Sequence, residues 1–204
     1  MSLADALTAM FGSACEAVVH DFTDLDHSII HITGSVTGRR IGGSPTNTML
    51  AVLKQSQVPD ALINYTACAP DGHALRSTSV FIKDGNGTPL GCFCLNIDVT
   101  RLILAADPGG AATAPNQSRT ETFADTPEAV TRTALNRLLA ANAWDDARNL
   151  SRTQKIELIQ ELDQAGVFFL RGAADIVARL LGVARSTIYV YLRASTSNNN
   201  KEEQ

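Results

Sequence analysis

The chain has 204 residues, of which 45% are hydrophobic, a composition that supports a folded core and argues against disorder. Its formal net charge of −4 excludes a protein that is basic throughout. The charge is unevenly spread. Residues 1–147 contain nine Lys and Arg against fifteen Asp and Glu, whereas residues 148–194 contain seven against four. A basic segment that follows an acidic one indicates a DNA-reading part joined to a part with another role.

The cysteines and the N-terminal residues indicate the cellular compartment of the protein. Cys15, Cys68, Cys92 and Cys94 form no CxxC pair, and Asp5 stands where a secretory signal would be basic. No apolar run approaches the roughly 18 residues of a membrane span. We therefore expect a cytoplasmic protein with reduced thiols and no membrane contact.

The N-terminal half predicts an α+β domain. Residues 1–19 have apolar residues at helical spacing, which predicts an amphipathic helix. Residues 28–33 are β-branched and predict a strand, Pro45 opens a short helix that runs through Leu53, and a second strand lies near 61–68. The apolar positions of the first helix are Leu3, Leu7, Met10, Phe11, Ala14 and Val18.

The clearest feature of this half is a β-hairpin formed by residues 75–83 and 90–99, with the turn residues 84–87 between them. Alternation along the second strand places Cys92, Cys94, Asn96 and Asp98 on one face and Phe93, Leu95, Ile97 and Val99 on the other. An antiparallel sheet with flanking helices is one way to build a domain that senses a small ligand.

Polar residues of this predicted sheet are candidates for a ligand pocket. Asn96 interrupts an apolar strand, and a buried amide needs hydrogen-bond partners. The competing interpretation is that protein groups supply those partners. The ligand-binding candidates are Thr46, Asn47, Ser77, Ser79 and Asn96.

Metal binding and catalysis have weaker signals. Cys92 and Cys94 alternate with apolar residues, as buried free cysteines do, and their spacing is not that of a structural zinc site. The chain has no nucleophile elbow, P-loop or dinucleotide-binding fingerprint. We expect no metal site, no cofactor and no catalytic residue. The potential ligands weighed were His20, Asp21, Asp24, Asp26, His27, Cys68, Cys92 and Cys94.

The second half predicts a linker and a helical domain. Residues 107–125 are rich in Gly, Pro, Ala, Ser and Thr, which is typical of a flexible linker. Thr126-Pro127-Glu128 predicts the start of a connecting helix over 126–147, and Ser151 with Gln154 predicts a capping box inside a DNA-binding domain over 148–194. The polar tail 195–204 is expected to be disordered.

Residues 173–193 have the layout of a helix-turn-helix. Two short amphipathic segments meet at Gly182, where a tight turn needs positive φ, and Ala178 is small enough for close helix approach. Ile188 and Tyr191 are the apolar anchors of the second segment, which would enter the major groove of DNA. The alternative is an ordinary helical hairpin that packs on itself and exposes its other face to solvent. The candidates for DNA contact are Arg185, Ser186, Thr187, Tyr189, Val190 and Arg193.

The sequence resembles the YheO-like PAS plus helix-turn-helix regulators, a family that includes the D-arginine utilisation repressor. The resemblance rests on residues 18–22, 28–43, 76–91, 94–98, 150–173 and 181–192. It implies a PAS-like sensor over 1–106, a cytoplasmic bacterial transcription regulator and no catalysis.

Three functions remain as hypotheses. The first is a regulator, expected to be a repressor, that senses an amino-acid-like small molecule and binds a double-stranded DNA operator as a homodimer or higher homo-oligomer. The second is a protein-interaction module whose sensor domain docks a partner protein without specific DNA binding. The third is a small metal-dependent or thiol enzyme.

Overall fold

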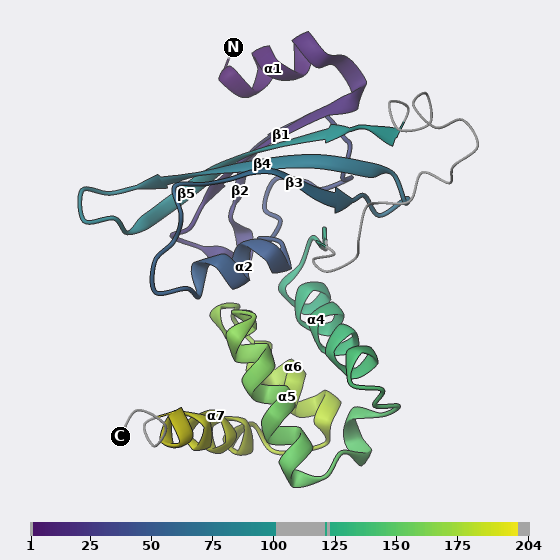
Figure 1. Ribbon diagram of the computed structural model, residues 1–204, viewed down its shortest axis with the longest axis vertical. Helices are drawn as coiled ribbons and strands as arrows, with labels where there is room; N and C mark the ends of the chain where they lie inside the picture. The colour runs from purple at the N-terminus through teal and green to yellow at the C-terminus, as the bar shows by residue number, and fades with distance from the viewer. Residues whose placement is uncertain (1, 101–120, 122, 200–204) are drawn as a thin grey trace. The chain divides into compact units, whose positions relative to one another are not determined.

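The structure is a computed structural model that describes residues 2–100, 121 and 123–199, the last six of them as backbone. The chain divides into two compact units, Met1–Asp125 and Thr126–Gln204 (Figure 1). The first unit is built on a β-sheet and the second is helical. The fold class is therefore α+β, as predicted.

The N-terminal unit contains a five-stranded sheet in the order β2-β1-β5-β4-β3, in which all neighbouring strands are antiparallel. β4 and β5 form the predicted hairpin, whose turn has positive φ at Gly87. The strands are β1 (Cys15–Asp21), β2 (Ile29–Thr33), β3 (Ala61–Cys68), β4 (Ala74–Lys83) and β5 (Pro89–Asp98).

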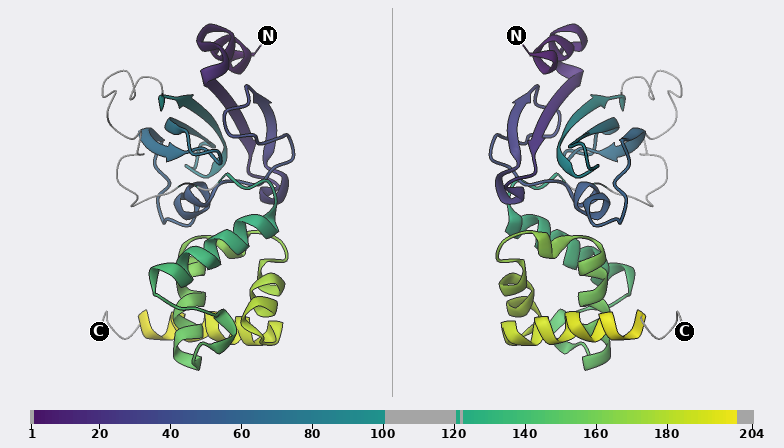
Figure 2. Two further views of the ribbon diagram at one scale, coloured as in Figure 1. Left: turned by 90° about the vertical axis from the view of Figure 1, so that its right-hand side faces the viewer. Right: turned by 90° about the vertical axis from the view of Figure 1, so that its left-hand side faces the viewer.

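Two helices, α1 (Leu3–Phe11) and α2 (Asn47–Leu53), lie on opposite faces of the sheet (Figures 1 and 2). Thr46 caps α2 by accepting a hydrogen bond from the Met49 backbone N–H, so this helix begins two residues after the predicted Pro45. Short 3₁₀ turns lie at Gly12–Ala14 and Leu25–His27.

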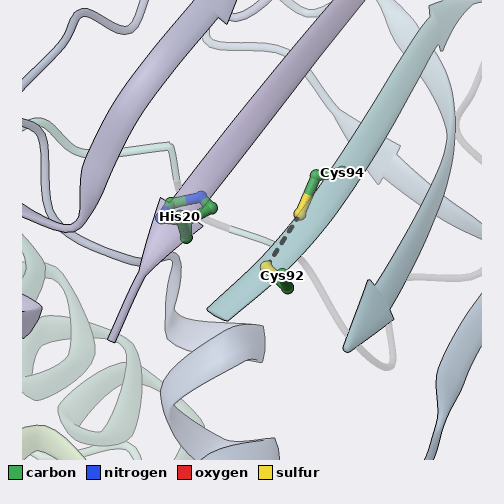
Figure 3. Close-up of side chains that lie close together, drawn as sticks. All are labelled: His20, Cys92 and Cys94. Atoms are coloured by element: carbon green, nitrogen blue, oxygen red, sulfur yellow. Dashed lines mark hydrogen bonds between the residues drawn. The ribbon is translucent and has the colours of Figure 1, made fainter. Parts of the chain in front are cut away.

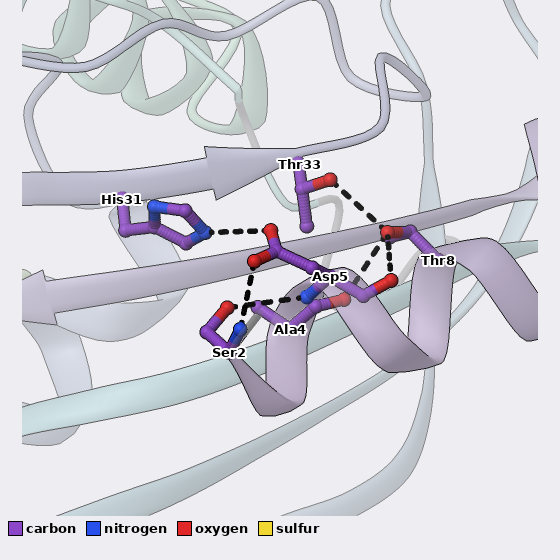
Figure 4. Close-up of polar contacts among 6 residues, drawn as sticks. All are labelled: Ser2, Ala4, Asp5, Thr8, His31 and Thr33. Carbon is purple, nitrogen blue, oxygen red and sulfur yellow. Dashed lines mark hydrogen bonds and ion pairs between the residues drawn. The ribbon is translucent and has the colours of Figure 1, made fainter.

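Polar contacts fix α1 to β2 (Figure 4). The Thr8 and Thr33 hydroxyls lie 3.0 Å apart, and Asp5 Oδ1 lies 3.3 Å from His31 Nε2. A capping box between Ser2 and Asp5 starts the helix.

The prediction of one helix over residues 1–19 was wrong. Helix α1 ends at Phe11, where Gly12 follows with φ 69°, and residues 15–21 form β1 instead. β1 lies between β2 and β5 in a sheet that has α1 on one face and α2 on the other, and Ala17 and Val18 are fully buried. A strand buried on both faces has no alternating polar residues, and an apolar run of this kind is not distinguished from a helix by periodicity.

The described part of the C-terminal unit consists of four α-helices, α4 (Pro127–Ala141), α5 (Arg152–Gln164), α6 (Ala173–Leu181) and α7 (Arg185–Asn199), with 3₁₀ turns at Ala147–Asn149 and Val167–Phe169. Its core is apolar, and α7 extends past Ser195, where we expected the helical domain to end. Its large side chains that are at most 1% exposed are Val130, Leu135, Leu158, Ile159, Leu162, Val167, Val177, Leu181 and Ile188.

Capping residues start the helices of this unit where the sequence predicts. Thr126 accepts a hydrogen bond from the Ala129 backbone N–H, and Pro127 is the first residue of α4. Ser151 and Gln154 form both bonds of a capping box at α5.

Most of the expected linker lies outside the described residues, as does the end of the tail, 200–204. The described part of the linker, Glu121 and 123–125, belongs to the N-terminal unit. No helix of the described residues is long and apolar enough to cross a membrane.

Candidate functional site

The strand register brings the predicted polar residues onto one face of the sheet. Residues directly opposite each other in neighbouring strands point to the same side. We call this side, which α2 covers, the inner face. Across β1, β5 and β4 its three rows are Glu16, Asn96 and Ser77; Val18, Cys94 and Ser79; and His20, Cys92 and Phe81.

The first row is a hydrogen-bonded chain of buried groups. Ser77 Oγ donates to Asn96 Oδ1 over 2.8 Å, and Asn96 Nδ2 donates to Glu16 Oε1 over 3.1 Å. Glu16 also accepts from the backbone N–H and the hydroxyl of Thr37, at 2.8 and 2.7 Å. Protein groups therefore supply the partners of Ser77 and Asn96 in this structure.

Thr46, Arg39 and Glu121 form a second buried polar group, in which Arg39 interacts electrostatically with Glu121. Thr46 Oγ1 donates to Glu121 Oε1 over 2.6 Å, and the Arg39 guanidinium donates to the Ser44 carbonyl. Glu121 Oε2 and Arg39 Nε are buried and have no hydrogen-bond partner among the described residues. Burial raises the pKa of Glu121 to about 7, because it removes water from the carboxylate.

Hydroxyl groups continue the polar surface into the second row. The Tyr65 hydroxyl lies 3.0 Å from Ser79 Oγ, which lies 3.1 Å from Cys94 Sγ. Burial raises the pKa of Tyr65, so this side chain is a neutral hydrogen-bonding group. Asn47, the remaining ligand-binding candidate, is half-buried at the first position of α2.

Possible metal ligands meet where the second and third rows adjoin (Figure 3). The donor atoms of His20, Cys92 and Cys94 all lie within 4.8 Å of one another, and all three side chains are buried. Burial raises the pKa of the Cys92 thiol, whereas the hydrogen bond from Cys92 lowers the pKa of Cys94. No metal site was expected at these residues, because Cys92 and Cys94 alternate with apolar residues and their spacing is not that of a structural zinc site.

Sequence reasoning missed four polar residues of this region. Glu16 and Tyr65 lie in strands, Arg39 lies in the segment between β2 and α2, and Glu121 lies in the segment taken as a linker. Of these four, Glu16 could have been recognised from the sequence, because it is a charged residue within the otherwise apolar stretch Cys15–Val19.

The helix-turn-helix in the C-terminal unit has the predicted anchors. Gly182 has φ 65° and ends α6, and the Val183 backbone N–H donates to the Ala178 carbonyl over 3.0 Å. Ile188 is fully buried and Tyr191 is 8% exposed. These two side chains fix which side of α7 faces the core.

The remaining side chains at the start of α7 face away from the core. Arg185 lies 3.4 Å from Asp175 of α6, and it donates to the Tyr189 hydroxyl over 3.1 Å. The Arg185 guanidinium also lies 5.7 Å from the centre of the Tyr189 ring. Of the other DNA-contact candidates, Thr187 is half-buried and the rest are exposed: Ser186, Tyr189, Val190 and Arg193.

Two family models match the chain. The YheO-like PAS domain matches residues 1–108, and an HTH domain matches residues 134–193. The chain belongs to the YheO-like PAS family. The combination of a YheO-like PAS domain and an HTH domain in one chain is that of a DNA-binding transcription regulator.

Relatives match both units. The chain is 27% identical to the "Uncharacterized protein YheO" of Escherichia coli K12 over 206 residues, which cover 97% of this chain and 84% of the relative. It is 24% identical to the "Transcriptional regulator DauR" of Pseudomonas aeruginosa over 201 residues, which cover 94% and 90%. A solved structure, "VqmA bound to DPO", is 13% identical with a TM-score of 0.31, covering 96% of this chain and 84% of that one. A similarity at that level carries no argument about this protein.

Proposed function

We propose that the chain is a one-component regulator whose YheO-like PAS domain binds a small metabolite and whose recognition helix α7 reads an operator in double-stranded DNA. The observation that carries this proposal is the inner face, beside which Glu16, Arg39 and Glu121 are all buried. Burying a charged group costs free energy. Charged groups that remain buried despite this cost are concentrated at sites where proteins bind polar ligands.

The buried charges favour an amino-acid-like effector. A ligand carboxylate would pair with Arg39, whose Nε has no partner among the described residues. A ligand ammonium or amide group would donate to Glu121, whose Oε2 also lacks one there. Hydroxyl and amide groups beside them would fix the orientation of the ligand. The proposed ligand-binding residues are Thr46, Asn47, Ser77, Ser79 and Asn96.

DNA contact is proposed for the exposed side of α7. The Arg185 ion pair with Asp175 has side chains 59% and 46% exposed, and a pair this exposed contributes little stability, so a guanine edge or a phosphate can replace it. Ser186 and Thr187 lie in the first turn of α7, where backbone N–H groups also favour phosphate. The proposed set is Arg185, Ser186, Thr187, Tyr189, Val190 and Arg193.

A homodimer is the assembly we propose, because near-palindromic operators are read by paired recognition helices. The side of the sheet opposite the inner face carries exposed Val80 and Ile82, and α1 on the same side carries exposed Leu3 and Met10. Apolar residues left exposed in this way fit a second copy of the chain. The same residues would fit a partner protein, which is the alternative function.

The regulatory role completes the proposal. We infer a non-enzymatic repressor that acts in the cytoplasm, where the chromosome is. The effector changes DNA affinity only through a difference in its own affinity for two conformations of the protein.

A DNA titration tests whether the protein binds an operator. Binding to the upstream DNA of the protein's own gene is measured at two salt concentrations for the wild type, Arg185→Ala/Thr187→Ala and Arg132→Ala. We expect tight, salt-sensitive binding, which the double variant weakens by about 1–3 kcal/mol per lost base contact. Arg132 lies on α4 and pairs with Glu128, so its variant controls for loss of one positive charge. Folded protein that binds no DNA at either salt, with or without the effector panel below, would favour the interaction module.

An effector panel tests the sensing function. Single amino acids are added to the same titration, with the wild type, Arg39→Met and Arg40→Met. We expect one of them to change the DNA affinity of the wild type and of Arg40→Met, whose substituted residue is exposed. Arg39→Met should keep its DNA binding and lose the response. A response that survives in Arg39→Met contradicts the proposed ligand site.

A further inference from the structure

His20, Cys92 and Cys94 form a compact cluster of metal-binding side chains on the inner face (Figure 3). His20 lies directly opposite Cys92 in the register of β1 and β5, and Cys94 is two residues further along the same face. Cys92 Sγ lies 3.4 Å from Cys94 Sγ and 3.9 Å from Met49 Sδ of α2. The register and the covering helix thus bring two thiols, an imidazole and a thioether together.

A hydrogen-bond relay prepares His20 to bind a metal. His20 Nδ1 lies 2.8 Å from Ser28 Oγ, and Ser28 Oγ donates to the Gly43 carbonyl. When the ring carries its proton on Nδ1, this N–H donates to Ser28 Oγ and leaves the lone pair of Nε2 for a metal. Hydrogen-bond partners of this kind orient the histidine ligands of metal sites.

The donor set selects the ion. Thiolate sulfur binds both Cu(I) and Zn(II), but the Met49 thioether is a soft ligand suited to Cu(I). Structural zinc sites instead use four Cys, His or carboxylate ligands.

We propose that His20, Cys92 and Cys94 bind one Cu(I) ion, with Met49 Sδ as a fourth ligand. Binding replaces the thiol protons by the metal and releases them to solvent, and the copper stays in the monovalent state throughout. The site goes beyond the proposed metabolite sensing and stands without it, since it needs neither an effector nor DNA. It adjoins the proposed effector site, because Ser79 contacts Cys94.

The test is a titration of the reduced full-length protein with Cu(I) under anaerobic conditions, in competition with a chromophoric copper chelator. We expect one ion per chain and thiolate-to-copper charge-transfer absorption in the ultraviolet. Cys92→Ser, Cys94→Ser and His20→Gln should each weaken binding by at least the roughly 10–100-fold that loss of a hydrogen-bond partner of a metal ligand costs. Cys68→Ser is the matched control, since Cys68 lies on β3 outside the cluster and its loss should change nothing.

The wild type alone provides a second readout if a cluster variant fails to fold. X-ray absorption at the copper edge should show two or three sulfur ligands and one imidazole per ion. A shell of nitrogen and oxygen alone, Cu(I) affinity unchanged in Cys92→Ser and Cys94→Ser, or equal loss in Cys68→Ser would overturn the site. Tighter binding of Zn(II) than of Cu(I) in parallel competition would overturn the choice of ion.

Discussion

The two units of this protein use their interiors differently. Among the described residues, the N-terminal unit buries twelve polar or charged side chains, and the C-terminal unit buries one, Thr131. Apolar packing holds the helical unit together, and its proposed functional residues are on the surface of α7. The sheet unit instead holds polar groups inside. The comparison teaches that apolar packing stabilises the helical unit, whereas the sheet unit keeps a hydrogen-bonded group of polar side chains inside its core.

The largest effect is expected in the apolar core of the helical unit. Leu181→Ala removes a fully buried side chain beside the turn at Gly182 and should lower the free energy of unfolding by about 2–5 kcal/mol. The unfolding transition in guanidinium, followed by the fluorescence of Trp144, the chain's one tryptophan, measures this. Val190→Ala on the exposed side of α7 is the control, expected within about 0.5 kcal/mol of the wild type. Equal losses in both variants would contradict the core described here.

The next effect is a pH dependence confined to the sheet unit. Burial raises the pKa of Glu121 from 4.5 to about 7 in the folded protein, so the ionised carboxylate destabilises the folded state. This destabilisation is absent below pH 4.5 and complete above pH 7. The free energy of unfolding of Glu121→Gln should therefore rise by about 3 kcal/mol relative to that of the wild type between pH 4 and pH 8. Urea unfolding followed by circular dichroism measures the gain, with Trp144 as an unchanged internal reference. Glu157→Gln, an exposed substitution on α5, controls for the lost charge, and a gain no larger than in that control would contradict the burial of Glu121.

A smaller effect is expected within the first row of the inner face. Asn96→Ala leaves Ser77 and Glu16 each without one hydrogen-bond partner and should destabilise the sheet unit by about 1–3 kcal/mol. Hydrogen exchange of β1 and β5 should become faster, while exchange in α5 stays the same. Asn86→Ala in the exposed hairpin turn is the matched control. Unchanged exchange in Asn96→Ala would show that the row is not held by this amide.

The smallest effect tests the capping box of α5. Ser151→Ala removes the bond to the Gln154 backbone N–H and should cost about 1 kcal/mol. Trp144 fluorescence in a guanidinium titration measures it, with Thr153→Ala, an exposed change in the same first turn, as the control. A loss of stability in the sheet unit alone would contradict the division of the chain into two separately stabilised units.

The sequence by itself determined the features that depend on local chemistry. Ser151 with Gln154, Thr126 with Pro127 and the turn at Gly182 carry their own signals, because caps and positive φ need particular residues at fixed spacing. The hairpin of β4 and β5 follows from alternation in the same way. The family resemblance added the PAS and HTH assignment, which the family models confirm.

Only the tertiary structure decided what meets on the inner face. Glu16 and Asn96 are 80 residues apart in the chain, and Thr46 and Glu121 are 75 apart, so no local pattern joins them. The missed strand β1 is the physical reason, since a central strand supplies the register that sets Glu16 beside Asn96 and His20 beside Cys92. Alternation on β5 separated its two faces correctly, but pairing and covering by α2 determined that the polar face is the buried one.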